Sequence, residues 1–330
     1  MFRQYLTTFL ALIISSSVFA EELVVYSGRK AKFVKPLIEE FSKQSGVDIK
    51  LLSGSSSILL STLALQGDKA KADIYLGNDV ANLQRGSDNG IFRKLPAHIT
   101  SVVPSRYRSA NADWVGLSAR LRVLVVNTNK PYTSNINSVL DLAAPDMKNR
   151  IAITHSNNES FISGASSYRH ILGKADYMNW LKGIKNNADS NIFHKHSHIV
   201  SAVATGKVDV GLVNHYYALS HMKKHPDAPL KLVIPDQKQG QIGAAWNMSG
   251  IAISRYSKNH QAAERLVAFL LSAQNQKIFA EVNQEYPTRP RVPLAKGVPT
   301  MKTIRLIKTP LEEISHQRED TITELHRVGL

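Results

Sequence analysis

Residues 23–52 read LVVYSGRKAKFVKPLIEEFSKQSGVDIKLL, and this stretch decides the fold. Residues 23–26 form a short apolar, β-branched run that predicts a strand followed by a Ser-Gly turn. Residues 31–45 then place apolar side chains at helical spacing, and Gly46 ends that helix. Residues 47–52 predict a second strand. A strand, a helix and a strand in this order indicate parallel pairing, with the helix on one face of the sheet.

Working outward from this unit, strand and helix signals keep alternating along the chain. Further strands are predicted at residues 72–76, 121–126, 151–153, 208–213, 230–234 and 250–254, and helices at residues 58–66, 260–272 and 274–283 and in the charged tail after Pro310. This alternation predicts an α/β fold with helices on the faces of the sheet. Because no low-complexity linker and no internal repeat interrupts the sequence, we expect two α/β lobes joined by crossing strands.

The first twenty residues, MFRQYLTTFLALIISSSVFA, have the pattern of a cleaved export signal. Arg3 supplies the positive start, residues 9–14 form a short apolar core, and Ala20 is a small residue of the kind that precedes a signal-peptidase cut. The apolar run is well short of the roughly 20 residues that span a bilayer. We therefore expect residues 1–20 to be removed as a signal peptide and the mature chain to be exported.

Composition and charge exclude several classes of protein. The chain has 330 residues, of which 43% are hydrophobic and 20% charged, as is typical of a soluble globular protein. Cysteine is absent, which excludes disulfides, thiolate metal sites, cysteine nucleophiles and a lipid anchor on cysteine. Lys and Arg number 41 against 26 Asp and Glu, and the formal net charge of +15 suits an anionic ligand, an anionic membrane surface or nucleic acid. The basic residues are scattered and an exported protein seldom meets nucleic acid, so we expect no nucleic-acid partner.

Four short blocks of sequence become specific when their order and spacing are taken together. They are VYSGR at 25–29, WVGLSARLRV at 114–123, GKVDVGLVNHYY at 206–217 and QEYP at 284–287. With these blocks the chain resembles the periplasmic ferric-iron-binding proteins, the substrate-binding components of bacterial iron ABC importers. The resemblance covers essentially all of residues 23–330. It implies the two-lobe periplasmic binding protein fold of type II, with a hinge formed by crossing strands.

The resemblance also implies where the lobes begin and end and which ligand and partner proteins the chain binds. The first lobe would comprise residues 21–122 and 250–298, and the second lobe residues 123–249 and 299–330. The lobes are expected to close over a ferric ion or ferric chelate, and the closed form is expected to deliver it to an inner-membrane ABC permease and its ATPase. The same resemblance implies a periplasmic protein that acts as a monomer.

Tyr216 and Tyr217 directly follow a predicted strand, at the edge of the sheet where α/β proteins commonly bind ligands. Ferric iron is a hard, highly charged cation, and phenolate oxygen is a hard anionic donor. Iron can therefore displace the phenol proton although free tyrosine has a pKa of about 10. An arbitrary pair of adjacent tyrosines usually only packs. In the Asn-His-Tyr-Tyr context this pair resembles the iron-binding pair of the family, which implies that both side chains are metal ligands.

The sequence departs from the family at two positions where relatives carry further ligands. A frequent histidine ligand aligns with Lys30, whose ammonium group cannot coordinate iron. A frequent glutamate ligand aligns with Asn78, whose amide oxygen is a poor replacement for a carboxylate. Glu159 is a further candidate metal ligand, and its alternative role is a helix-opening charge near the helix dipole.

The loss of these ligands leaves ferric charge to be balanced by a bound anion, and relatives use a synergistic anion such as carbonate or phosphate. The resemblance therefore implies Fe3+ bound together with carbonate or a similar anion. Residues 156–160 precede a helix, whose first N–H groups suit an anion, and arginine binds carboxylate-like anions through two parallel hydrogen bonds. The candidate anion-binding residues are Arg29, Arg120, Arg122, Asn158, Ser160, His196 and Asn214.

Three other functions remain open at this stage. The same fold binding a phosphonate, a sugar phosphate, thiamine or a polyamine would explain the altered ligand positions. The sequence HKHSH at 194–198 suits zinc if it forms a strand, because alternate histidines would then share one face. An exported hydrolase would use Glu159 and a neighbouring histidine, but the sequence contains no nucleophile elbow, Walker-type loop or HExxH helix. We therefore do not expect an enzyme.

Overall fold

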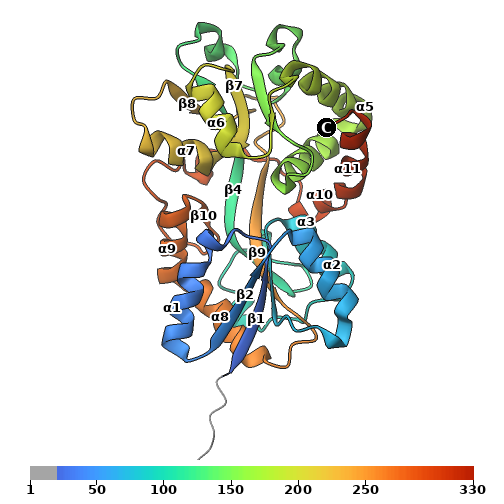
Figure 1. Cartoon of the computed structure of the whole chain (residues 1–330), viewed down its shortest axis with the longest axis vertical. Coiled ribbons are helices and arrows are strands. Elements are labelled where there is room, and N and C mark those ends of the chain that lie inside the picture. The colour runs from blue at the N-terminus through green and yellow to red at the C-terminus, as the bar shows by residue number, and fades with distance from the viewer. Residues whose placement is uncertain (1–20) are drawn as a thin grey trace, which may run out of the picture.

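The computed structural model describes residues 21–330, so the predicted signal segment 1–20 lies outside the described residues. The chain forms two lobes stacked along the long axis of the molecule (Figure 1). The lobes are connected through the long central strands β4 (Trp114–Asn127) and β9 (Trp246–Ile253). The predicted α/β fold with lobes joined by crossing strands is therefore confirmed.

The N-terminal lobe, at the bottom of Figure 1, is built on the strand order β2-β1-β3-β9-β4. Strands β1, β2 and β3 pair in parallel, and β9 pairs antiparallel with β3 and β4. In the first helix, α1, one face buries Leu37, Ile38 and Phe41, and Gly46 ends the helix with φ of 72°, which glycine adopts without a Cβ clash. The elements of this lobe, besides β4 and β9, are β1 Glu22–Ser27, α1 Lys35–Ser45, β2 Asp48–Ser53, α2 Ser56–Gln66, β3 Ile74–Gly77, α3 Val80–Asp88, α4 Ala97–Thr100, α8 His260–Leu270, α9 Ala273–Asn283 and β10 Tyr286–Pro287.

The second lobe continues the same sheet in the order β4-β7-β5-β6, with β8 also beside β4. Strand β5 is parallel to β6 and β7, whereas β7 and β8 are antiparallel to β4. The longest helix, α5, is broken at Gly173, where φ is 74°. The elements of this lobe are β5 Ile151–Thr154, α5 Glu159–Ala188, β6 Ile192–Phe193, α6 His196–Ala204, β7 Val210–Asn214, α7 His215–Lys224 and β8 Leu230–Val233.

Strand β4 runs through both lobes and carries the polar residues of the hinge. Residues 114–121 pair with β9, and residues 122–126 pair with β7. Every residue of β4 is buried. The sequence predicted a strand over 121–126 alone, because Ser118 and Arg120 interrupt the apolar run that normally marks a buried strand.

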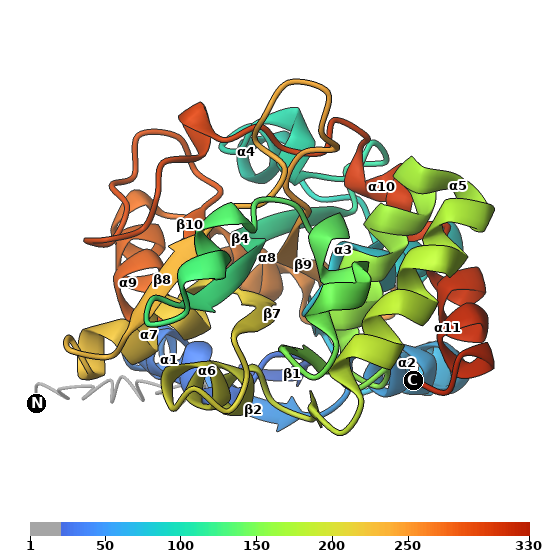
Figure 2. The same cartoon turned by 90° about the horizontal axis from the view of Figure 1, so that it is seen from above.

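The chain ends in helices that contact both lobes. Helix α10 (Leu311–Ser315) packs against α3 of the N-terminal lobe and α5 of the second lobe, and α11 (Arg318–Arg327) lies along α5 (Figure 2). The predicted helical tail is confirmed. Short 3-10 turns lie at Ala31–Phe33, Gly67–Lys69, Ser105–Tyr107, Pro131–Asn135, Leu140–Ala143, Pro145–Met147 and Met301–Thr303.

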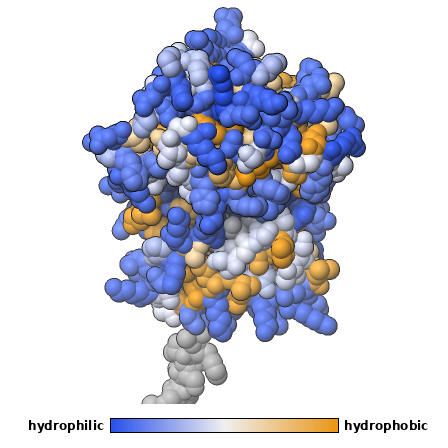
Figure 3. Space-filling view, turned by 45° about the horizontal axis from the view of Figure 1, so that its top comes forward, coloured by the Kyte–Doolittle hydropathy of each residue, from blue (hydrophilic) through white to orange (hydrophobic). Residues whose placement is uncertain are grey.

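The surface of the molecule is mostly hydrophilic and is broken by hydrophobic patches (Figure 3). Between residues 21 and 330 we find no helix with the length and apolarity needed to cross a membrane.

Candidate functional site

A cleft of about 380 Å³ opens between the two lobes beside β4. Its walls are the turn after β1 and the end of β3 on one side, and the starts of α5, α6 and α7 on the other. Most of the predicted site residues line it, namely Arg29, Lys30, Asn78, Asn158, Glu159, Ser160, His196, Tyr216 and Tyr217. The remaining ones, Arg120, Arg122 and Asn214, are buried and bonded to residues of this cleft. The fold thus brings together side chains that are up to 188 positions apart, from Arg29 to Tyr217.

Tyr216 and Tyr217 lie in the first turn of α7, directly after Asn214, the last residue of β7. Their ring centroids are 4.6 Å apart. The Asn214 side-chain amide donates a hydrogen bond of 3.2 Å to the Tyr216 Oη atom. Across the cleft, the Phe33 ring of the N-terminal lobe meets the Tyr216 ring edge-on at 6.2 Å. These contacts hold Tyr216 in place, and Tyr217 packs against its ring in the lining of the cleft.

Both tyrosines are neutral phenols in the ligand-free site. Burial raises the pKa of Tyr216, and the charge of Glu285 adds to the effect. Burial raises the pKa of Tyr217 further above its ordinary value, and the neighbouring Tyr216 contributes. A ligand that uses these oxygens as anions must therefore displace two protons, which a ferric ion can do and a weakly charged solute cannot.

Arg122 lies behind the tyrosine pair with an incomplete set of partners. Its Nη1 atom donates to Asn214 Oδ1 at 3.1 Å and contacts His196 Nε2 at 3.4 Å. Within residues 21–330 its Nε and Nη2 atoms have no hydrogen-bond partner. Burial lowers the pKa of Arg122 to about 10, so the guanidinium stays charged at neutral pH. Burying a charged group whose donors lack partners costs free energy unless an anion accepts hydrogen bonds from those donors.

Two further cations, Arg120 beside the cleft and Lys30 in its lining, have no carboxylate partner in the described part of the chain. Arg120 donates from Nη2 to the backbone oxygen of Asn78 at 2.5 Å, and its Nη1 atom is unpartnered among those residues. Lys30 sits at the opposite wall, where burial lowers its pKa and the charges of Lys32 and Lys195 lower it further. The cleft therefore combines phenol oxygens with an excess of positive charge.

Arg29 differs from the other arginines because its charge is already neutralised. Its Nη2 atom binds the Glu285 carboxylate at 2.7 Å, and Nη1 donates to Ser118 Oγ at 3.0 Å and to Ser249. The guanidinium also lies over the Phe279 ring, 5.0 Å from its centroid. The partner Glu285 stands in the QEYP block but was assigned no role from the sequence, since nothing local indicates a contact over 256 positions.

The start of α5 uses its own side chains for capping. Asn158 Oδ1 accepts hydrogen bonds from the backbone N–H groups of Ser160 and Phe161, at 3.1 and 3.3 Å. The N–H groups that were expected to be free for an anion are therefore partly occupied. The Ser160 hydroxyl accepts a bond of 3.1 Å from the Asn214 amide, which ties it to the base of the tyrosine pair.

Glu159 reaches across the cleft to the N-terminal lobe. Its Oε1 atom accepts hydrogen bonds from the Ser57 N–H at 3.3 Å and from the Ser55 and Ser57 hydroxyls at 3.4 Å. Burial raises its pKa, and the nearby carboxylate of Asp79 acts in the same direction. The Glu159 carboxylate therefore already has partners at the start of α2, in an arrangement that links the lobes.

His196 is the first residue of α6, so residues 194–198 do not form the strand on which the zinc interpretation depended. The reason is that residues 196–204 read HSHIVSAVA, and their apolar positions pack as a helix against the sheet. Burial, followed by the charges of Arg122 and Arg120, holds the pKa of His196 well below its ordinary value. Its ring lies 5.1 Å from that of Tyr217. Across residues 21–330 no cluster of three histidine or carboxylate side chains is arranged to hold a metal ion, so the zinc interpretation has no support.

Comparison with known proteins places this geometry among iron-binding relatives. Residues 23–282 match the family of bacterial extracellular solute-binding proteins. The chain is 28% identical to iron uptake protein A1 of Synechocystis sp. over 300 residues, 89% of this chain and 83% of the relative. The structure is similar to a ferric binding protein from Campylobacter jejuni, with a TM-score of 0.86 and 25% identity over 93% of this chain and 99% of that one. It is also similar to the Trichodesmium protein IdiA (FutA) in complex with iron and citrate, with a TM-score of 0.79 and 28% identity over 93% of this chain and 99% of that one.

Proposed function

The chain belongs to the family of bacterial extracellular solute-binding proteins, and from this premise we propose that it captures ferric iron in the interlobe cleft and delivers it to an ABC importer. It is a solute-binding protein and not an enzyme. The observation that carries the proposal is the tyrosine pair, whose phenol oxygens face a cleft shared by both lobes. The names of the similar proteins, an iron uptake protein and a ferric binding protein, support the same ligand.

We assign Tyr216 and Tyr217 as the protein's iron ligands, with the remaining coordination supplied by an anion and water. The guanidinium atoms of Arg120 and Arg122 that have no partner among residues 21–330 support a bound carbonate or carboxylate that would bridge metal and arginine. A carboxylate chelator is also compatible, since a similar protein from Trichodesmium was solved with iron and citrate. Lys30 and Asn78 occupy the altered family positions, and both line the cleft. Lys30 contributes a positive charge, and the backbone oxygen of Asn78 accepts a hydrogen bond from Arg120.

We further propose a periplasmic monomer that works with an inner-membrane permease and its ATPase. The family description and the predicted export signal support the location. The lobe division at residue 122 is part of the proposal, and the change of partner strand along β4, from β9 to β7 after Leu121, supports it.

Of the alternative solutes, thiamine and polyamines are cations, which the excess of positive charge in the cleft would repel. Phosphonates and sugar phosphates suit that charge and can accept hydrogen bonds from neutral phenols, but the similar proteins are named for iron. Iron with an anion uses both features, so the alternative solutes are not favoured.

The test is a titration of the iron-free mature protein with ferric nitrilotriacetate in bicarbonate buffer at neutral pH. Tyrosinate–iron charge transfer should produce a visible absorption band that saturates at one iron per protein. Tyr216→Phe and Tyr217→Phe keep the ring packing but remove the oxygen, so each should weaken or abolish the band while the melting temperature of the iron-free protein changes little. Tyr256→Phe, remote from the cleft, is the matched control and should bind as the parent protein does. A parent protein without the band, or Phe variants with an unchanged spectrum, would contradict the assignment of Tyr216 and Tyr217 as iron ligands.

A further inference from the structure

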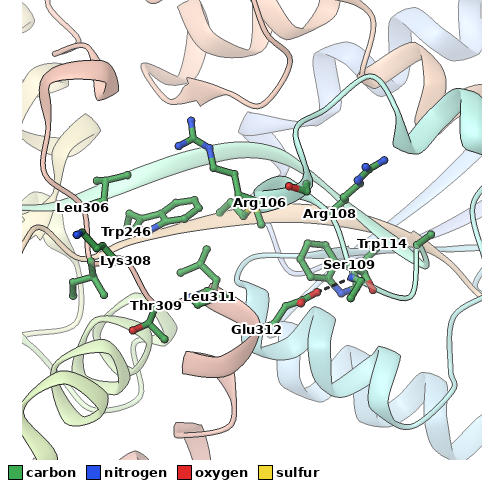
Figure 4. A pocket seen from close by; sticks show the side chains of 16 residues that line it. Arg106, Arg108, Ser109, Trp114, Trp246, Leu306, Lys308, Thr309, Leu311 and Glu312 are labelled. Carbon is green, nitrogen blue, oxygen red and sulfur yellow. Dashed lines mark hydrogen bonds between the residues drawn. The ribbon is translucent and has the colours of Figure 1, made fainter.

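A second and larger cavity, of about 800 Å³, lies at the rear of the hinge. We call it the hinge-back pocket and define it by Arg106, Arg108, Trp114, Trp246, Met248 and Leu311 (Figure 4). The loop before β4 lines one side of it, and the segment that leads into α10 lines the opposite side. A cavity of this size, in which an apolar wall adjoins polar and charged side chains, is typical of small-molecule sites.

The hinge-back pocket and the iron cleft lie on opposite faces of the crossing strands. Arg120 pairs with Asn247 across β4 and β9, and Arg120 reaches the cleft at Asn78. Because side chains alternate along a strand, Trp246 and Met248 face the other way, into the pocket. The register shift between residues 116 and 118 places Trp114 on that same rear face.

The lining of the pocket indicates the chemistry of its ligand. The indole rings of Trp114 and Trp246 and the Leu311 side chain supply an apolar wall.

Basic side chains stand at the rim of this apolar wall. In the described part of the chain, Arg106, Arg108 and Lys308 form no ion pair with a carboxylate. The carboxylate that lines the pocket, Glu312, accepts a 3.0 Å bond from the backbone N–H of Ala110. The pocket thus matches a molecule with an apolar body and one anionic group.

We propose that the hinge-back pocket binds a small amphipathic carboxylate and that its occupancy holds the lobes closed. In this structure the lobes touch across the cleft through Glu159 and Ser57. Opening the cleft rotates the lobes about β4 and β9, which narrows the space behind these strands. A molecule that fills the rear space therefore opposes opening of the lobes. Because the closed form holds the ligand of the interlobe cleft, occupancy of the hinge-back pocket also raises the affinity of the cleft for that ligand.

The first experiment titrates octanoate into the iron-free mature protein and follows tryptophan fluorescence and calorimetric heat. The uncharged 1-octanol, of matched chain length, is the control ligand. We expect saturable octanoate binding at least tenfold tighter than that of 1-octanol, and loss of most of this difference in Arg106→Gln/Arg108→Gln. Trp246→Phe keeps the apolar wall and should remove much of the fluorescence change while the calorimetric binding remains. Octanoate that binds no better than 1-octanol, or equally well to the double arginine variant, overturns the site.

The second experiment measures iron affinity by chelator competition with and without saturating octanoate. The parent protein should bind iron several-fold more tightly with octanoate, and the double arginine variant should show no such gain while its affinity without octanoate stays unchanged. Octanoate binding without any gain in iron affinity overturns the coupling. The direct titration needs no iron, so a failure of the proposed iron function would be distinguishable from a failure of this pocket.

Discussion

Arg122 shows at the scale of a single residue why an anion is expected beside the iron. Replacing it with glutamine keeps a donor toward Asn214 but removes the positive charge and the free Nε and Nη2 donors. In bicarbonate buffer, Arg122→Gln should lower iron affinity about tenfold or more, because a hydrogen bond to a charged group contributes roughly 1.5–3 kcal/mol. In carbonate-free buffer the affinity should stay equal or rise, since a repelling cation has been removed.

Chelator competition in the two buffers measures this difference in anion dependence. Arg255→Gln, on the outer side of the N-terminal lobe where Arg255 donates to the Gly90 backbone, serves as the charge-matched control and should leave both affinities unchanged. Equal losses of affinity with and without carbonate would show that Arg122 supports the tyrosine pair and not an anion.

At the scale of an element, the start of α5 depends on the Asn158 cap. Asn158→Ala removes the acceptor of two backbone N–H groups, and the free energy of unfolding should fall by about 1 kcal/mol. Asn158→Asp keeps an acceptor and adds a negative charge at the helix N-terminus, so it should retain stability. Urea denaturation followed by circular dichroism measures both variants. An unchanged midpoint for the alanine variant would mean that this cap contributes nothing and that the N–H groups are available to another partner.

At the scale of the whole molecule, a Glu159 variant distinguishes two roles for this side chain, a contact between the lobes and an iron ligand. Its carboxylate bonds Ser57 of the opposite lobe, so Glu159→Ala should favour the open form and increase the radius of gyration of the iron-free protein in small-angle X-ray scattering. Iron affinity should fall about tenfold through loss of closure, while the position of the visible band stays the same. Glu319→Ala, an exposed glutamate at the start of α11, is the matched control. A shifted band in Glu159→Ala would instead identify Glu159 as an iron ligand.

Local sequence patterns were sufficient to predict the α/β alternation, the crossing of strands between lobes, the helical tail and the place of the tyrosine pair at a strand end. These features depend on neighbours within a few residues, through the hydrophobic period, the glycines that end helices and the sequence Asn-His-Tyr-Tyr at 214–217. The zinc interpretation required residues 194–198 to form a strand, but the apolar residues that determine the local structure come later, within α6.

The partners of the charged groups were decided by the tertiary structure alone. Arg29 is paired with Glu285 and Glu159 is held by Ser57, whereas Arg122 keeps two donors without a partner among residues 21–330. No residue near each of them in the sequence indicates these differences. The hinge-back pocket likewise joins residues near 108 to residues near 311 behind β4. The physical reason is that a charge takes its partner from whatever the fold places within about 4 Å, and no periodicity in the chain records that distance.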